Sequence, residues 1–153
     1  MKRRSVLAAG AGLGLGGMAL LLARSASATP EEMAAAIARF TGGAAHKDGK
    51  VKFDIAQLVD NGNAVPVTIR VESPMTAADY VTSIAIFNER NPNTDIVVFT
   101  LGPRAGKAEV STRIRLATSQ KLIALARMSD GSFWSQSVDV IVTLAACIEG
   151  EAS

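Results

Sequence analysis

The stretch Val65-Pro66-Val67-Thr68-Ile69-Arg70-Val71 carries an apolar, β-branched residue at every second position. Successive side chains of a strand point to opposite faces of a sheet, so this alternation predicts a strand with one buried face and one face in water. Pro66 has no backbone N–H to donate to a neighbouring strand. We therefore expect this strand to lie at the edge of a sheet or to contain a bulge.

Strand patterns also occur on both sides of this stretch, and turn signals such as Asn61-Gly62 and Asp130-Gly131 separate them. The further strands are expected at residues 51–55, 80–87, 96–101, 110–116, 121–128 and 133–144. The run at 121–128 is the most continuously apolar and suits a central strand. About seven short strands predict an all-β fold, an immunoglobulin-like β-sandwich, with a small barrel as the alternative.

A short helix is expected before the strands, at residues 30–40. Thr29 can cap it, and Pro30 suits its first position. Three apolar residues recur at helical spacing and should dock on the sandwich: Met33, Ile37 and Phe40. The polar connector at 44–50 contains His46, the only histidine of the chain. A metal site needs several converging ligands, so we interpret His46 as solvated.

The first 28 residues predict a targeting signal. Lys2-Arg3-Arg4 is a twin-arginine start, a weakly apolar run follows at residues 6–23, and Ala26-Ser27-Ala28 is a cleavage pattern. A transmembrane anchor is the alternative, but five glycines dilute the run. We expect cleavage after Ala28 and export to the periplasm by the twin-arginine route.

The charge balance changes when the signal is set aside. Four of the 16 basic residues lie in residues 1–28, which leaves 12 basic residues against 14 acidic ones in the mature chain. This slightly acidic balance gives no indication of a nucleic-acid surface. We expect one folded unit, made of a helix and connector at residues 29–50, a sandwich domain at 51–144 and a mobile C-terminal arm at 145–153.

Cys147, the only cysteine, lies on that arm. An exported chain with one thiol cannot form an internal disulfide, so the thiol is either buried and inert, paired with another chain, or chemically used. The small residues Ala145 and Ala146 precede it, and Ile148, Glu149 and Gly150 follow, with little to anchor them in a core. These neighbours favour an exposed, chemically used thiol.

The thiol has no activating group in its own sequence neighbourhood. Glu149 and Glu151 oppose ionisation of a nearby sulfur, and no lysine or arginine lies beside it. The sequence also has no cysteine–histidine pair, phosphate-binding glycine loop or cluster of metal ligands that predicts catalysis or a cofactor. We therefore expect a non-enzymatic protein without a cofactor, whose thiol reacts inside another protein's basic pocket.

Several longer motifs carry a family resemblance. They are Asn61-Gly62-Asn63-Ala64-Val65-Pro66-Val67, Glu72-Ser73-Pro74-Met75, Phe87-Asn88-Glu89-Arg90-Asn91-Pro92, the block at residues 102–116, Ser129-Asp130-Gly131-Ser132-Phe133-Trp134, and Val142-Thr143-Leu144-Ala145-Ala146-Cys147. With these motifs the chain resembles the SoxY family, the substrate-carrier subunits of the periplasmic sulfur-oxidising (Sox) system. The resemblance covers most of the mature chain.

The resemblance implies a covalent carrier that pairs with a second β-sandwich, SoxZ. It implies that the SoxAX cytochrome couples thiosulfate to Cys147 as an S-thiosulfonate, and that the SoxB hydrolase then releases sulfate and leaves sulfane sulfur on the carrier. A sulfane dehydrogenase or another acceptor would handle the remaining sulfur. A slim arm that bears one sulfur atom can enter several active sites in turn, and the covalently linked substrate is not lost between them.

The arm departs from the family pattern. SoxY chains typically end in Gly-Gly-Cys-Gly-Gly, whereas this chain has Ala145-Ala146-Cys147-Ile148-Glu149-Gly150. Alanine restricts the backbone more than glycine, and Ile148 and Glu149 add bulk and charge beside the thiol. The departure indicates adjusted partners or another sulfur cargo. A different class of function, an exported binding or assembly module with a structural Cys147, is the alternative.

Overall fold

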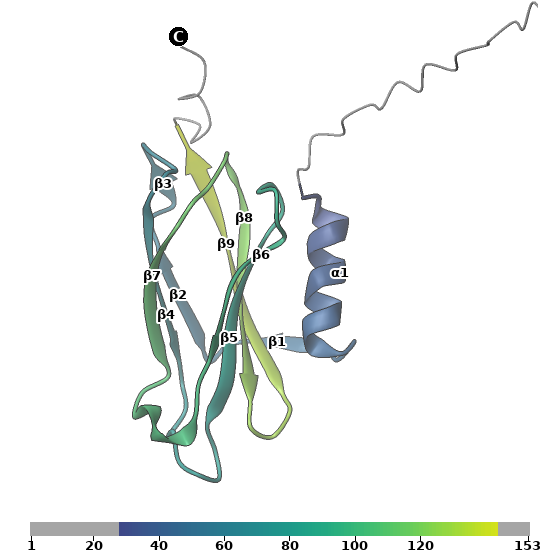
Figure 1. Cartoon of the computed structure of the whole chain (residues 1–153), viewed down its shortest axis with the longest axis vertical. Coiled ribbons are helices and arrows are strands. Elements are labelled where there is room, and N and C mark those ends of the chain that lie inside the picture. The colour runs from purple at the N-terminus through teal and green to yellow at the C-terminus, as the bar shows by residue number, and fades with distance from the viewer. Residues whose placement is uncertain (1–27, 144–153) are drawn as a thin grey trace, which may run out of the picture.

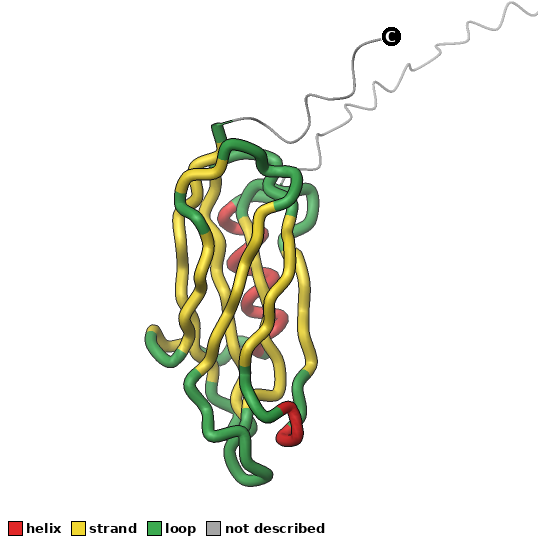
Figure 2. Tube along the Cα trace, turned by 90° about the vertical axis from the view of Figure 1, so that its left-hand side faces the viewer, coloured by secondary structure: helices red, strands yellow, loops and turns green. Residues whose placement is uncertain are grey.

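A computed structural model describes residues 28–143. Two β-sheets pack face to face around a core of aliphatic side chains, and one helix lies on the outer face of the larger sheet (Figure 1). Viewed from the side of the smaller sheet, the helix lies behind the strands (Figure 2). The predicted all-β sandwich is confirmed.

The larger sheet has the order β1-β9-β8-β5-β6, and β3 also pairs with β9. Its strands are β1 (His46–Asp48), β3 (Leu58–Val59), β5 (Val81–Asn88), β6 (Asp95–Thr100), β8 (Gln120–Met128) and β9 (Phe133–Val142). The smaller sheet has the order β2-β4-β7, with strands β2 (Val51–Ile55), β4 (Val65–Val71) and β7 (Glu109–Ile114). All pairs are antiparallel except those of β1 and β3 with β9.

The alternating apolar residues of β4 are buried on one face of the strand, as predicted. Its four apolar branched residues are buried between the sheets: Val65, Val67, Ile69 and Val71. The predicted central strand at 121–128 is β8, which lies between β9 and β5. Residues of β5 and β8 are buried on both faces, because one face meets the smaller sheet and the other meets the helix.

The expectation that Pro66 places its strand at an edge is wrong. β4 is the middle strand of the smaller sheet, and it pairs with both β2 and β7. Pairing with β2 begins only at Val67, opposite Ile55, so Pro66 lies beyond the stretch that β2 covers. The proline therefore occupies a position in the central strand that has a neighbour on one side only.

The helix α1 (Pro30–Thr41) forms as predicted. The Thr29 hydroxyl accepts the Glu32 N–H, and the Glu32 carboxylate accepts the Thr29 N–H, which completes a capping box. Gly42 ends the helix in the left-handed conformation with a φ of 66°. Met33 and Ile37 are buried, and Phe40 packs edge-on against Phe87 and Phe133.

The connector that contains His46 is not a simple polar loop. Residues 46–48 form β1, which pairs in parallel with residues 133–135 of β9. A three-residue strand is too short to show a periodic pattern, so no pattern in the sequence predicts it. Within residues 28–143, no helix combines the length and the hydropathy that a membrane crossing requires.

Candidate functional site

The predicted site residues lie outside the described residues: Cys147, together with Ala145, Ala146, Ile148, Glu149 and Gly150. The structure does describe the residues that immediately precede this segment. We call Ile141, Val142 and Thr143, at the end of β9, the arm root. It lies at the end of the molecule that also carries β3 (Figure 1).

One side of the arm root is hydrogen-bonded to β3 and its flanking residues. The Ile141 N–H donates to the Gln57 carbonyl at 2.7 Å, and the Thr143 N–H donates to the Val59 carbonyl at 2.9 Å. The Thr143 hydroxyl also lies 3.4 Å from an Asp60 carboxylate oxygen. These bonds hold β9 beside β3 up to its last residue, Val142, and also fix the backbone of Thr143 just beyond it.

The other side of the arm root is bonded to Ser119. Pairing of β9 with β8 ends at Val140, opposite Gln120. The backbone of β9 beyond Val140 therefore has no backbone partner on β8. The Ser119 hydroxyl oxygen accepts the Val142 N–H at 2.8 Å and lies 3.4 Å from the Val142 carbonyl oxygen. A side chain thus continues the hydrogen bonding of β9 two residues beyond the end of the ladder, and it fixes the arm root from the side opposite β3.

Gly62 packs tightly beneath the arm root. A Cβ added at this glycine would lie 2.1 Å from the Leu116 carbonyl oxygen and 3.3 Å from Cγ1 of Val142. The Gly62 carbonyl also accepts the Leu116 N–H at 2.8 Å. The Asn61-Gly62 turn was predicted from turn chemistry, but a close approach between two backbones is what requires glycine here.

Amide side chains join the loops at this end of the sandwich. The Asn91 side-chain NH₂ donates to the Arg115 carbonyl at 2.7 Å, and its oxygen accepts from Gln120 Nε2 at 2.8 Å and from the Ala117 N–H at 3.0 Å. The Arg115 guanidinium donates twice to Asn63 Oδ1, at 2.8 and 3.1 Å. We call Asn63, Asn91, Arg115 and Gln120 the amide platform. It holds three loops in place beside the arm root.

Sequence reasoning did not find the amide platform or Ser119. Asn91 occurs only within a family motif, and Arg115 occurs only within the motif block at residues 102–116. A signal was present in Gln120, because this amide lies two residues before Leu122, on the strand face that the pattern buries, and it is buried in the structure. A polar residue at a position that the pattern assigns to the core needs hydrogen-bond partners.

His46 is exposed, as expected, and its ring is also bonded to β9. Its Nδ1 lies 2.8 Å from the Ser135 hydroxyl oxygen, which is 3.5 Å from a carboxylate oxygen of Asp48. Ser135 is buried beneath this contact. Among residues 28–143, no group of three or more histidine, cysteine, aspartate or glutamate side chains could hold a metal ion. His46 therefore belongs to the pairing of β1 with β9.

The two aromatic residues at the start of β9, Phe133 and Trp134, differ in their burial. Phe133 is buried under α1, whereas Trp134 is half-buried, with Lys50 Nζ 4.9 Å from its ring centroid. In the preceding turn, the Ser132 hydroxyl and backbone N–H donate to Asp130 and lower the pKa of its carboxyl group. These contacts stabilise the hairpin and the packing of β1.

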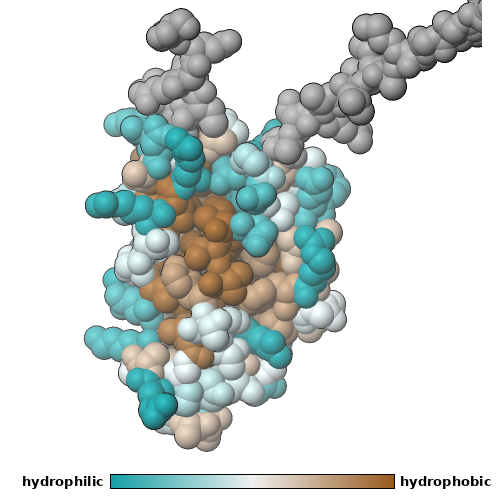
Figure 3. Space-filling view, in the orientation of Figure 1, coloured by the Kyte–Doolittle hydropathy of each residue, from teal (hydrophilic) through white to brown (hydrophobic). Residues whose placement is uncertain are grey.

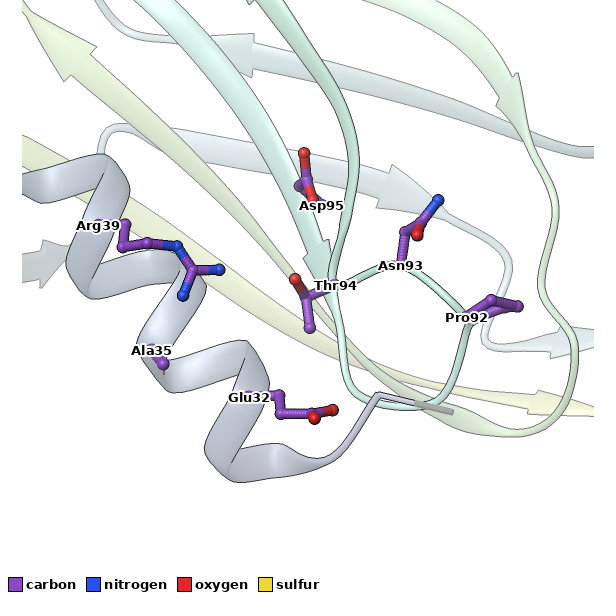
Figure 4. A pocket seen from close by; sticks show the side chains of 7 residues that line it. All are labelled: Glu32, Ala35, Arg39, Pro92, Asn93, Thr94 and Asp95. Atoms are coloured by element: carbon purple, nitrogen blue, oxygen red, sulfur yellow. The ribbon is translucent and has the colours of Figure 1, made fainter. Parts of the chain in front are cut away.

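One hollow lies between α1 and the loop after β5, with a volume of about 340 Å³ (Figure 4). It is lined by Glu32, Ala35, Arg39, Pro92, Asn93, Thr94 and Asp95. Glu32 serves the capping box, and the lining has no cysteine or histidine. We assign no chemistry to this hollow.

Comparison with protein families gives one match that decides the family. Residues 37–147 match the family model of the sulfur oxidation protein SoxY, and the matched range includes Cys147. The chain belongs to the SoxY family. No curated protein sequence matches the chain at a significant level.

Solved structures agree with the SoxY assignment. The sulfur carrier protein SoxY from Chlorobium limicola f thiosulfatophilum is 27% identical, with a TM-score of 0.63 over 74% of this chain and 98% of that one. A superoxide reductase (neelaredoxin) from Ignicoccus hospitalis is 16% identical, with a TM-score of 0.56 over 76% of this chain and 95% of that one. This second likeness concerns the fold alone.

Proposed function

We propose that this SoxY-family chain is a covalent carrier in thiosulfate oxidation, with Cys147 as the attachment residue and SoxZ as its partner in a heterodimer. It is exported to the periplasm by the twin-arginine route and is not itself an enzyme. The SoxAX cytochrome, the SoxB hydrolase and a sulfane dehydrogenase act in turn on the sulfur that the chain presents. The family match and the 27% identical sulfur carrier support this function.

The attachment step is an oxidation. The Cys147 thiol loses its proton, its sulfur bonds to the terminal sulfur of thiosulfate, and two electrons pass one at a time to oxidised cytochrome. The product is an S-thiosulfonate on Cys147. Water then attacks the sulfonate sulfur in the hydrolase, which breaks the sulfur–sulfur bond, releases hydrogen sulfate and leaves a persulfide on the cysteine.

The observation that carries this proposal is the fixed arm root. Thr143 is bonded to Val59, and Ser119 bonds to the neighbouring residue Val142. Cys147 follows Thr143 by four residues, so its Cα can lie at most about 14 Å from the Thr143 Cα, as in a fully extended chain. A cysteine tethered at this length to a fixed point can be presented to several different active sites.

Intact-mass measurement tests the attachment. After incubation of the chain and SoxZ with thiosulfate and oxidised SoxAX cytochrome, we expect the chain to gain the mass of one thiosulfate unit. Reduction should remove this mass, because a disulfide-type bond holds the adduct. An unmodified mass in the presence of active cytochrome would refute thiosulfate as the cargo of this chain.

The two arm glutamates give a second measurable expectation. Glu149 and Glu151 lie two and four residues beyond the thiol, and their charges disfavour the thiolate. We expect the Glu149→Gln/Glu151→Gln variant to react with iodoacetamide about twofold to fivefold faster at neutral pH and low salt, since the thiolate is the nucleophile. The gain should shrink as salt is added. Equal rates at low salt would show that these charges do not act on Cys147.

A further inference from the structure

One side of the sandwich is left open between β6 and β7. These consecutive strands are joined through the 3₁₀ turn η1 (Pro103–Ala105) and lie in opposite sheets. Within residues 28–143 each is an edge strand with one neighbour, β5 for β6 and β4 for β7. The opposite side is closed, since the Phe53 N–H of β2 donates to the Gln136 side chain of β9 at 2.6 Å.

The open side exposes part of the hydrophobic core, and we call this strip the seam. Val97 and Val110 pack against the core but are only partly buried, and Phe99 and Leu101 are also partly exposed. Figure 3 shows hydrophobic atoms gathered between β7 and β6. Val98, on the other face of β6, is 48% exposed. An apolar strip between two unpaired strand edges is typical of a protein interface.

Cations border the seam. Arg104 and Lys107 lie in the segment between β6 and β7, and Arg113 lies on β7. All three are exposed, and none forms an ion pair or hydrogen bond with a described residue. By contrast, Glu109 of the same strand is paired with Arg70 at 3.0 Å. The border on the β7 side therefore has unpaired positive charge next to apolar surface.

We propose that the seam binds the partner subunit, a β-sheet protein that presents an apolar strand flanked by carboxylates. The inference rests on the proposed function, in which this partner is SoxZ. Apolar side chains would fill the seam, the unpaired edge of β6 or β7 could extend a sheet across the interface, and acidic groups would neutralise Arg104, Lys107 and Arg113.

A second copy of this chain fits the seam less well. In a two-fold symmetric pair whose axis crosses the strands, the β7 border of one copy faces the β7 border of the other, so the cations of the two copies would lie together. Like charges placed together at an interface cost binding energy, whereas an acidic partner gains from the same residues. The charge on the seam border thus favours a different protein as the occupant.

The test is titration of this chain with SoxZ by calorimetry, with size-exclusion chromatography and light scattering for the masses. We expect Lys107→Glu/Arg113→Glu to weaken binding about hundredfold, and Val97→Thr/Val110→Thr, which preserves side-chain shape, to weaken it about tenfold. Lys121→Glu, an exposed charge reversal on β8 away from the seam, should bind like the wild type. Thermal unfolding of each variant confirms that it is folded.

Each outcome shows whether the seam is the SoxZ interface. Wild-type affinity in both seam variants would place the interface elsewhere and overturn this inference, while the Cys147 adduct would still support the carrier function. Self-association of the wild type that Val97→Thr/Val110→Thr abolishes would make the seam a homomeric interface, which also overturns it. A wild-type chain that does not bind SoxZ would overturn both the seam inference and the heterodimer, and the adduct mass would again report on Cys147 separately.

Discussion

Replacement of Cys147 by serine is expected to reduce sulfate release from thiosulfate to the background rate of the Sox system lacking this chain. A hydroxyl oxygen cannot form the sulfur–sulfur bond that holds the cargo, although serine is close to cysteine in size. Since the chain has no other cysteine, no second thiol can take over. The measurement is sulfate formed per unit time by the reconstituted system, with SoxZ, SoxAX, SoxB and thiosulfate present.

Two controls separate loss of attachment from loss of structure. The Cys147→Ser variant should unfold at the wild-type temperature and bind SoxZ with wild-type affinity. A Ser153→Ala variant, which alters the same segment without removing the thiol, should release sulfate at the wild-type rate. Sulfate release by Cys147→Ser well above background would show that another group carries the sulfur, and the proposed function would then be wrong.

The parts of the fold that follow from local sequence were predictable. Burial of alternate residues in β4 follows from the pattern of valines and isoleucine, because a strand has a period of two. The start of α1 follows from Thr29, Pro30 and Glu32, which form a capping signature within four residues. In both cases the residues that decide the structure are neighbours along the chain.

Features that depend on contacts between distant segments were not predictable. β1 and β3 form by pairing with β9, which lies far from them in the sequence. Neither is long enough to show an alternating pattern of hydrophobic residues. β4 is the middle strand because both β2 and β7 pair with it, and Pro66 is tolerated because the pairing with β2 begins only at Val67. Ser119 is an ordinary loop residue in sequence, and only the end of the β8–β9 ladder gives it a role.

One part of the candidate site was predictable from the sequence, and the other part was not. Cys147 was identified from its uniqueness and its place in the chain, which are properties of the sequence alone. The fixed arm root and the amide platform are properties of the fold, because Asn91 and Asn63 reach Arg115 across 24 and 52 residues. In the proposed function, the sandwich supplies a fixed starting point and Cys147 supplies the reacting sulfur atom. A tether of this kind raises the local concentration of cargo only if its origin is fixed relative to the docked partner.

Alanine at position 62 is expected to lower the free energy of unfolding by about 3 kcal/mol, which corresponds to a fall in the melting temperature of about 10 °C. The added Cβ would meet the Leu116 carbonyl oxygen at 2.1 Å, a contact that no side-chain rotation relieves. Either the turn or the Leu116 backbone must move, and the hydrogen bond between Leu116 and Gly62 would be strained or lost. Urea and thermal unfolding measure the change.

The matched control is Gly102→Ala, because a Cβ at Gly102 meets nothing within 4 Å and its φ of −129° suits any residue. Stability there should stay unchanged or rise by up to about 1 kcal/mol, since alanine restricts the unfolded chain more than glycine does. Val142 lies 3.3 Å from the added Cβ at position 62, so hydrogen exchange at the Val142 and Thr143 amides should also accelerate in Gly62→Ala. Equal stability of the two variants would mean that the turn is not held against Leu116, and the arm root would then lack the support beneath it that the close contact at Gly62 provides.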